Sequence, residues 1–422
     1  MQTEQTQVTR RAIRFVLSAV TVLALVWAVL YSGRIALSRI FVKYGTTVAD
    51  ISAIDTAIGL TPSDAEVHYA HGAISNYFQQ PAEAVRQLEL AVSLRPHDYY
   101  FWQELGMTRE QLGDQNGALF ALNEAVRLAP YYAQPRWQRG NFLYRKGDYD
   151  QAFADLRQAA ASNPDFLPAL IDLAWGTARK DARVTEQILQ IQTNKGQFDL
   201  ALFFAQHGKP DEAVAHFHAA GTISAQDRRD LVKELILSHS IGEAYDVWSN
   251  RAAGAPSSNG SVFDGGFEGS LNRDEAGFGW RLAGVQPGLS LSLDGNQPQS
   301  GVRSLRVDFT GHAVPAAELI SQLIPVEATV HYKLNFAART HEIVTGGPLL
   351  VVIKDANDRQ ILGRSTRLPA DTNGWQMYRV EFATGSTSRA VVISLQREDC
   401  TSSPCPIFGS LNLDSFSLEK LR

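Results

Sequence analysis

Residues 99–132 read YYFWQELGMTREQLGDQNGALFALNEAVRLAPYY, and a similar pattern of small and apolar residues recurs at 65–98 and at 133–166. Each of the three segments is 34 residues long. When they are aligned, the following positions coincide: Gly72, Gly106 and Gly140; Ala84, Ala118 and Ala152; Leu88, Leu122 and Leu156; Ala91, Ala125 and Ala159; Pro96, Pro130 and Pro164. A fixed period of this length indicates a repeat architecture in which each unit must stack on its neighbours to bury its apolar face.

The residue types at the repeated positions predict that each unit is a helical hairpin. Glycine and alanine fit where two helix backbones approach closely, and the closing proline cannot continue a helix and so forces a turn. The period and the order of small and large residues resemble the tetratricopeptide repeat (TPR). The resemblance implies an all-α superhelix whose groove binds a protein partner, but it does not identify that partner.

We expect the repeat array to extend from 34 to 250, beyond the three clear units. Residues 49–62 fit the second helix of an upstream unit, whose first helix would continue from the apolar N-terminal segment through 34–44. Downstream the pattern decays, and Gly208 and Ala213 restore the register. Atypical units at the ends of an array act as caps.

Two arginines depart from the TPR pattern. Arg109 stands where a tyrosine is common, and Arg139 stands where a leucine is common. One hypothesis is that a set of arginines lines the groove and receives an acidic or anionic partner: Arg109, Arg136, Arg139 and Arg145. The alternative is a solvated helix face, with the aliphatic stems lying along the surface.

The N-terminus is predicted to be a short tail, 1–14, followed by a membrane anchor at 15–31. That segment, FVLSAVTVLALVWAVLY, is uncharged and lies at the lower limit of length for a bilayer-spanning helix. Trp27 and Tyr31 near its end are typical of a membrane interface. The alternative is a cleaved signal peptide, whose apolar region is usually shorter and ends at a small-x-small site.

Arginines and lysines flank both ends of this segment, so the positive-inside rule gives close to a tie. The short N-terminal tail favours a single-pass signal anchor in the inner (cytoplasmic) membrane, with the soluble part facing the periplasm or the cell exterior. Cys400 and Cys405, separated by TSSP, are the only cysteines. A disulfide between them would persist in an oxidising compartment. The alternative is two free thiols, because proximity in sequence does not guarantee the required geometry.

The character of the chain changes after residue 250. Residues 251–260, RAAGAPSSNG, have the composition of a linker. From 261 to 422, short strand-like runs alternate with turn residues, as in 289–293, 304–309, 349–353 and 390–395. This spacing favours an antiparallel β-sandwich. The fold class is therefore multidomain α + β.

The ordered segments of this C-terminal region resemble the galactose-binding-like jelly rolls, which include many carbohydrate-binding modules. The resemblance rests on FDGGFEGSL, SGVRSLRVDF, NGWQMYRVEF and GSLNLDSFSLEKL, among others. It implies that Glu268 and Asp414 match positions that often hold a structural calcium. Two carboxylates are too few for calcium on their own, so hydrogen bonding is the alternative.

Six residues are candidates for glycan binding: Trp280, Arg281, Arg339, Trp375, Gln396 and Arg397. Tryptophan can stack on a sugar ring, and arginine can bind hydroxyls or carboxylates in bidentate fashion. The alternatives are that the tryptophans pack in the core and that the arginines form surface ion pairs with neighbouring glutamates.

Composition and motifs narrow the function further. The net charge of −5 gives no basic surface for nucleic acid. No hydrolase, metalloprotease or nucleotide-binding motif occurs in a suitable context, so we expect no enzyme and no cofactor, with a structural calcium as the one alternative. The leading hypothesis is a scaffold of the bacterial cell envelope that is anchored in the membrane. It would bind protein through the TPR groove and glycan or protein through the sandwich, in surface-polysaccharide (exopolysaccharide) assembly or export. The alternatives are a purely structural assembly factor and a cryptic glycoside hydrolase.

Overall fold

The computed structural model describes residues 2–250, 260–282, 287–311, 318–400 and 404–421, with side chains from Phe15 onward except residue 16. Within these residues, fourteen α-helices precede ten β-strands. The contacts group the chain into two units, Met1–Gln190 and Ile191–Arg422. Each unit is described by itself.

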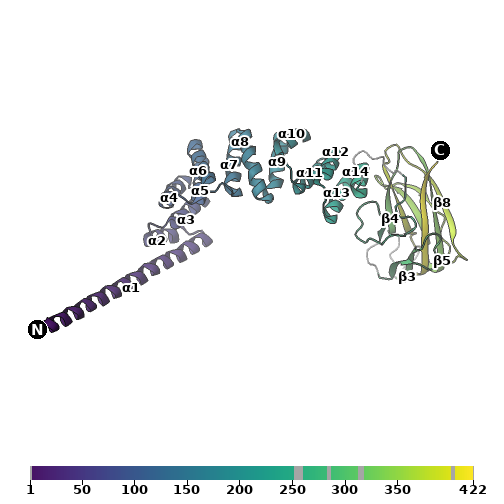
Figure 1. Cartoon of the computed structure of the whole chain (residues 1–422). Helices are drawn as coiled ribbons and strands as arrows, with labels where there is room; N and C mark the ends of the chain where they lie inside the picture. Colours follow the sequence, from purple (N-terminus) through teal and green to yellow (C-terminus); the bar gives the residue numbers. More distant parts are fainter. Residues whose placement is uncertain (1, 251–259, 283–286, 312–317, 401–403, 422) are drawn as a thin grey trace. The chain divides into compact units, whose positions relative to one another are not determined.

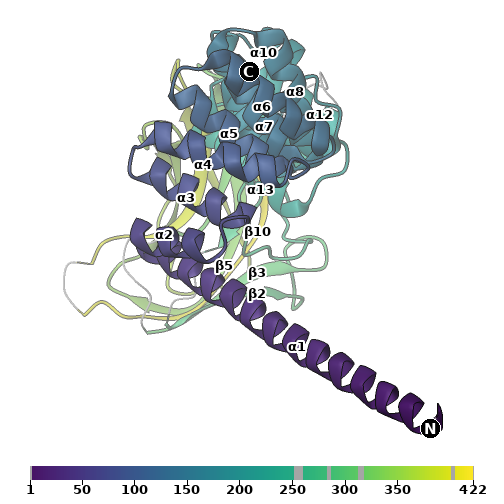
Figure 2. The ribbon, with the colours of Figure 1, turned by 90° about the vertical axis from the view of Figure 1, so that its left-hand side faces the viewer.

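The first unit begins with one unbroken helix, α1 (Gln2–Val48), which is seen along its length in Figure 2. Its last part packs against α2 (Ile51–Leu60). Ser38, which lies 34 residues before Gly72, is fully buried and donates a hydrogen bond to the carbonyl oxygen of Ala57. The end of α1 therefore serves as the first helix of the first hairpin.

Three hairpins follow, shown in Figure 1 as successive helix pairs: α3 (Ala65–Tyr77) with α4 (Pro81–Leu94), α5 (Tyr99–Gln111) with α6 (Gln115–Leu128), and α7 (Ala133–Lys146) with α8 (Tyr149–Ser162). Asp64 and Asp98 cap the N-termini of α3 and α5 by accepting hydrogen bonds from Glu66 N–H and Tyr100 N–H. These bonds satisfy amide groups that have no partner inside the helix.

The repeated glycines permit the close contact inside each hairpin. A Cβ atom added at Gly106 would lie 2.7 Å from Cγ of Leu122, and Gly72 and Gly140 show the same distance to Leu88 and Leu156. The three leucines are fully buried. A side chain at the glycine position would therefore separate the two helices of the hairpin.

The helical part continues with less regular hairpins. The first unit ends with a 3-10 turn (Pro164–Phe166), α9 (Leu167–Thr177) and α10 (Ala182–Leu189). The second unit begins with α11 (Asn194–Gln206), α12 (Pro210–Ala220), α13 (Ala225–Leu237) and α14 (Ile241–Ser249). Here α11 pairs with α12, and α13 pairs with α14.

The rest of the second unit is a β domain, defined here as the described residues from 260 to 421. Its strands are β1 (Arg281–Leu282), β2 (Leu289–Asp294), β3 (Ser304–Thr310), β4 (Glu318–Pro325), β5 (His331–Thr345), β6 (Leu349–Asp355), β7 (Ile361–Arg364), β8 (Gln376–Ala383), β9 (Ala390–Arg397) and β10 (Ile407–Lys420). Among the described residues they form two five-stranded antiparallel sheets, ordered β1-β4-β9-β6-β7 and β2-β3-β10-β5-β8.

The two sheets share one apolar core. Val307 and Leu411 from one sheet belong to the same buried cluster as Val351 and Ile393 from the other. The expectation of antiparallel sheets is confirmed, whereas the galactose-binding-like jelly roll stays a prediction. Of the expected linker, residues 251–259 lie outside the described part of the chain, and Gly260 N–H donates to the carbonyl oxygen of Pro325.

Candidate functional site

The first helices of the hairpins carry polar side chains that meet between neighbouring repeats. We call this surface of α3, α5 and α7 the A-helix face. Asn76 Nδ2 donates to Thr108 Oγ1 at 2.7 Å, and the Arg145 guanidinium donates to both carboxylate oxygens of Glu110 at 2.7 Å. These partners are 32 and 35 residues apart in the sequence. The repeat period thus places polar groups of successive helices side by side.

Glu104 and two tyrosines occupy the middle of the A-helix face. Burial raises the pKa of Glu104 above its ordinary value, and a hydrogen bond with Asn76 opposes this shift. The rings of Tyr69 and Tyr100 lie 5.3 Å apart between their centroids, and Tyr100 is 43% exposed. The face therefore offers both aromatic surface and an acidic group that is partly withdrawn from water.

Two buried oxygens near this face have no hydrogen-bond partner among the described residues: Asn76 Oδ1 and Gln103 Oε1. An unsatisfied buried acceptor is costly, and because both oxygens are shielded from the surface they belong to the helix packing and are not open to a docking partner. Asn76, Gln103 and Glu104 did not feature among the predicted site residues. They stand at three different positions of the repeat, and no pattern in the sequence marks them.

The structure uses three of the four candidate groove arginines within the helical packing. Arg136 and Arg139 both form ion pairs with the buried carboxylate of Asp155, at 3.2 and 2.6 Å. Arg109 pairs with Glu89 at 2.7 Å, and its own side chain is 20% exposed. The fourth candidate, Arg145 on α7, pairs with Glu110 on α5, and its side chain is 55% exposed.

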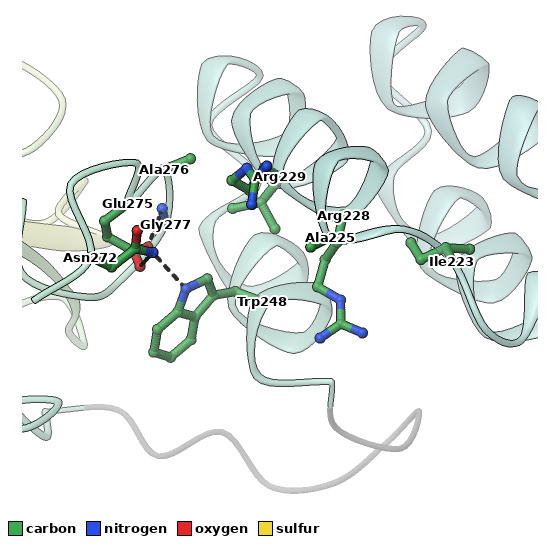
Figure 3. A pocket seen from close by; sticks show the side chains of 10 residues that line it. Ile223, Ala225, Arg228, Arg229, Trp248, Asn272, Glu275, Ala276 and Gly277 are labelled. Atoms are coloured by element: carbon green, nitrogen blue, oxygen red, sulfur yellow. Dashed lines mark hydrogen bonds between the residues drawn. The ribbon is translucent and has the colours of Figure 1, made fainter. Parts of the chain in front are cut away.

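In the second unit, α14 contacts the β domain through Trp248. The indole Nε1 donates to Glu275 Oε1 at 3.0 Å, as Figure 3 shows, and the ring lies 4.9 Å from that of Phe263. A Cβ atom added at Gly277 would lie 2.2 Å from Trp248 Cδ1. The loop that carries Glu275 is therefore shaped to receive this ring.

A cavity of about 320 Å³ adjoins this contact, and Arg228, Arg229 and Asn272 are among its lining residues (Figure 3). Arg281, a glycan candidate, lies nearby and donates to the carbonyl oxygens of Ala276 and Gly277. Burial lowers the pKa of Arg281. The structure thus uses Arg281 to support the loop that holds Trp248.

Two of the six glycan candidates come together at the surface of the β domain. The Arg339 guanidinium lies over the Trp375 ring at 5.1 Å from its centroid, a cation–π arrangement. Both side chains also bond the loop after β2: Trp375 Nε1 donates to the carbonyl oxygen of Gln297 at 2.9 Å, and Arg339 donates to that of Asn296 at 3.3 Å. Nothing in the sequence signalled that this loop would join the pair.

The other glycan candidates lie apart from this pair. Trp280 is 6% exposed, donates to the carbonyl oxygen of Asp264 and packs on Phe267 in the core. Arg397 is buried and donates to the carbonyl oxygens of Cys405 and Pro406. Gln396, on β9, bonds Glu318 and Ser394. These placements fit structural roles for the three residues.

The calcium candidates Glu268 and Asp414 are engaged by backbone amides. Asp414 is fully buried and accepts hydrogen bonds from Gln299 N–H and Ser300 N–H, and Glu268 accepts from Val302 N–H. A cation would compete with these donors for the same oxygens. Among the described residues, no group of three or more His, Cys, Asp or Glu is arranged to hold a metal. In this arrangement the two carboxylates hold the 299–302 loop by hydrogen bonds, and the calcium stays a prediction.

Cys400 and Cys405 form a disulfide next to β10. Arg397 Nη2 donates to the carbonyl oxygen of Cys405 at 2.8 Å, so the bridge rests on a buried guanidinium. Residues 401–403 of this loop lie outside the described part of the chain.

One helical segment, Leu17–Val48, has the length and apolar composition needed to cross a membrane. Its apolar side chains are exposed, as in Leu23 at 69% and Trp27 at 67%. The same properties are found in a signal sequence near an N-terminus. The structure therefore supports an apolar N-terminal helix that could be a membrane anchor or a signal sequence.

Comparison with known proteins identifies the repeat. A tetratricopeptide-repeat family model matches residues 99–132 and 133–166, which are the boundaries expected from the sequence. The chain therefore contains TPR repeats. No protein in the curated collection matches the chain.

Solved structures similar to part of this chain include MamA and YrrB. A crystal structure of MamA is 19% identical and covers 42% of this chain and 91% of its own, with a TM-score of 0.29. A MamA fragment from Desulfovibrio magneticus RS-1 is 16% identical and covers 38% and 94%, with a TM-score of 0.32. YrrB, described as a TPR protein with an unusual peptide-binding site, is 17% identical and covers 44% and 88%, with a TM-score of 0.32. Similarity at this level carries no argument about ligands.

Proposed function

We propose that this protein is a non-enzymatic scaffold whose TPR repeats bind an extended segment of a partner protein along the A-helix face. The observation that supports this most directly is the half-buried carboxyl of Glu104, which is hydrogen-bonded to Asn76 and lies on the same helix, α5, as the exposed ring of Tyr100. Backbone N–H groups of an extended peptide are the donors that such acceptors require, and tyrosine rings supply apolar contact area at small entropic cost.

Site-specific crosslinking in cells tests this proposal. A photoreactive amino acid replaces Tyr100 on α5, and the matched control replaces Tyr149, which is 48% exposed on α8 and lies outside the A-helix face. We expect a crosslinked protein from position 100 that is reduced by Asn76→Ala and absent from position 149. Equal crosslinking from both positions, or no effect of Asn76→Ala, would contradict the proposal.

We further propose that α1 anchors the scaffold in the inner membrane, with the remainder in the periplasm or at the cell exterior. The exposed apolar side chains of the 15–31 segment and the disulfide at Cys400 support this assignment. N-terminal sequencing of the mature protein distinguishes an anchor from a cleaved signal peptide. A mature chain that begins after residue 31, or reduced thiols accessible only from the cytosol, would overturn it.

A second candidate function belongs to the β domain, which we propose is a galactose-binding-like jelly roll that binds glycan. The half-buried Arg339–Trp375 pair is the observation that favours it, because a ring and a guanidinium held side by side can stack on a sugar and bond its hydroxyls. Such binding would suit a role in surface-polysaccharide assembly or export. Calorimetric titration of the full chain with polysaccharide fragments tests this binding. If no fragment binds at millimolar concentration, the β domain is purely structural.

A further inference from the structure

A cavity of about 410 Å³ lies where α1 enters the first hairpin. Its wall combines the end of the apolar segment, at Tyr31 and Ile35, with the turn after α2, at Thr61 to Asp64. Three arginines complete the wall: Arg34, Arg39 and Arg95. No feature of the A-helix face or of the Arg339–Trp375 pair uses this cavity.

The three guanidiniums exceed the carboxylates beside them. Arg39 and Arg95 share Asp64 and Glu66, with Arg39 at 2.9 Å from Asp64 and Arg95 at 3.0 Å from Glu66. Arg34 instead donates to the carbonyl oxygen of Leu60 at 2.8 Å, at the C-terminal end of α2. Among the described residues, Arg34 pairs with no carboxylate. The cavity therefore retains a positive charge. Its guanidinium donors are held in place by the contacts of Arg39 and Arg95 with the carboxylates and of Arg34 with Leu60.

The position of the cavity along α1 sets its depth relative to a bilayer. Arg34 is the first charged residue after the uncharged segment, and Tyr31 belongs both to that segment and to the cavity wall. Because α1 is continuous through this point, no flexible connection lets the cavity move away from the end of the apolar segment. A helix that crosses a bilayer at 15–31 therefore holds the cavity at the level of the lipid headgroups.

We propose that this cavity binds the phosphate of an anionic phospholipid headgroup. Arginine forms paired, charge-assisted hydrogen bonds with phosphate oxygens, and basic pockets beside membrane helices recognise anionic lipids in this way. The headgroup phosphate accepts from Arg34 and from the partly exposed Arg39 and Arg95, whose side chains are 40% and 44% exposed. The proposal rests on the membrane anchoring proposed above.

The full chain is reconstituted into nanodiscs of phosphatidylcholine with a minority of phosphatidylglycerol, and lipids that remain bound after extraction are counted by native mass spectrometry. We expect phosphatidylglycerol to be enriched on the protein and Arg34→Gln to weaken its retention about tenfold. Arg127→Gln is the matched control, because Arg127 is exposed on α6 and pairs with Glu124, three residues away on the same helix. Arg34→Gln leaves the Asp64 and Glu66 ion pairs intact, so it is expected to fold.

Three outcomes would overturn the proposal. The first is no enrichment of phosphatidylglycerol over phosphatidylcholine on the protein. The others are that Arg127→Gln loses as much bound phosphatidylglycerol as Arg34→Gln does, or that bound phosphatidylglycerol is lost only when Arg10, Arg11 and Arg14 are replaced. A second arm adds inorganic phosphate to the protein in neutral nanodiscs. A thermal stabilisation that depends on Arg34 there would identify a free-phosphate site in place of a lipid site. Extraction with carbonate tests separately whether α1 is inserted in the membrane. If the protein resists extraction but shows no preference for phosphatidylglycerol, the lipid site is refuted and the anchor is not.

Discussion

Arg139 binds the buried Asp155 through two hydrogen bonds, from Nε to Oδ2 at 2.6 Å and from Nη2 to Oδ1 at 2.7 Å. The Asp155 side chain is 6% exposed and the Arg139 side chain 21%. Removing one member of a buried pair leaves an uncompensated charge, which costs about 3–5 kcal/mol when burial is complete. We expect Arg139→Ala to lower the free energy of unfolding by about 2 kcal/mol, because Arg136 still pairs with Asp155 and the arginine is partly solvated.

Chemical denaturation of the full chain measures this loss. Arg127→Ala is the control: the Arg127–Glu124 pair is exposed, so this substitution should change the free energy of unfolding very little. If Arg139→Ala and Arg127→Ala lose equal stability, the Arg139–Asp155 ion pair does not stabilise the fold as described.

The repeated glycine sets the spacing of each hairpin. Gly106→Val places new atoms against Leu122 and is expected to destabilise the helical part by about 1–3 kcal/mol. Gly176→Ala is the matched control, because its Cβ meets nothing within 4 Å and alanine favours a helix by about 1 kcal/mol. Circular dichroism during thermal unfolding should show a lower melting temperature for Gly106→Val and a higher one for Gly176→Ala. A higher melting temperature for Gly106→Val would contradict the packing described.

Glu104 should make stability depend on pH. The folded protein holds its proton more tightly than the unfolded chain does, because burial raises the pKa above the ordinary value of 4.5. Stability should therefore fall as the pH rises from that value through the raised pKa, and then stay level. Glu104→Gln removes this dependence. The melting temperature of the variant should therefore exceed that of the parent at neutral pH, and the two should be similar below pH 4.5. A parent and variant that differ equally at both pH values would refute this.

The two glycan-candidate tryptophans should respond differently to substitution. Trp280→Ala removes a core side chain and is expected to cost about 3–5 kcal/mol. Trp375→Ala should cost much less and abolish any glycan binding, as should Arg339→Ala. Calorimetry and denaturation on the same samples separate the two effects. Glycan binding that survives Trp375→Ala would remove the proposed site.

The disulfide closes a short loop, so its removal should cost about 2 kcal/mol by the chain-entropy argument. Replacing both Cys400 and Cys405 with serine tests this in the full chain, and treatment of the parent with a reductant should give a similar loss. A β domain that unfolds completely after reduction would show that the bridge does more than constrain the loop.

The repeated helical architecture was predictable because its cause is periodic. Gly72, Gly106 and Gly140 recur in step, and each meets the same leucine of its own hairpin. The antiparallel sheets were predictable for a similar reason, since strands such as β9 alternate or run apolar between turn residues.

The candidate sites were harder to predict because they depend on contacts between distant segments. Arg136 and Arg139 read as groove residues until Asp155, on the partner helix, is seen to bind both. Arg339 and Trp375 are far apart in the sequence, and the loop at Gln297 that joins them has no motif. Ion pairs and loop contacts of this kind leave no periodic trace in a single sequence.

The continuity of α1 has a mechanical consequence. A bilayer that is thinner than the apolar segment makes the helix tilt. Since the Ser38–Ala57 bond joins the same helix to the first hairpin with no hinge between them, that hairpin must lean through the same angle. If α1 spans the bilayer as proposed, lipid thickness alone would steer the direction in which the first repeats present their binding surface.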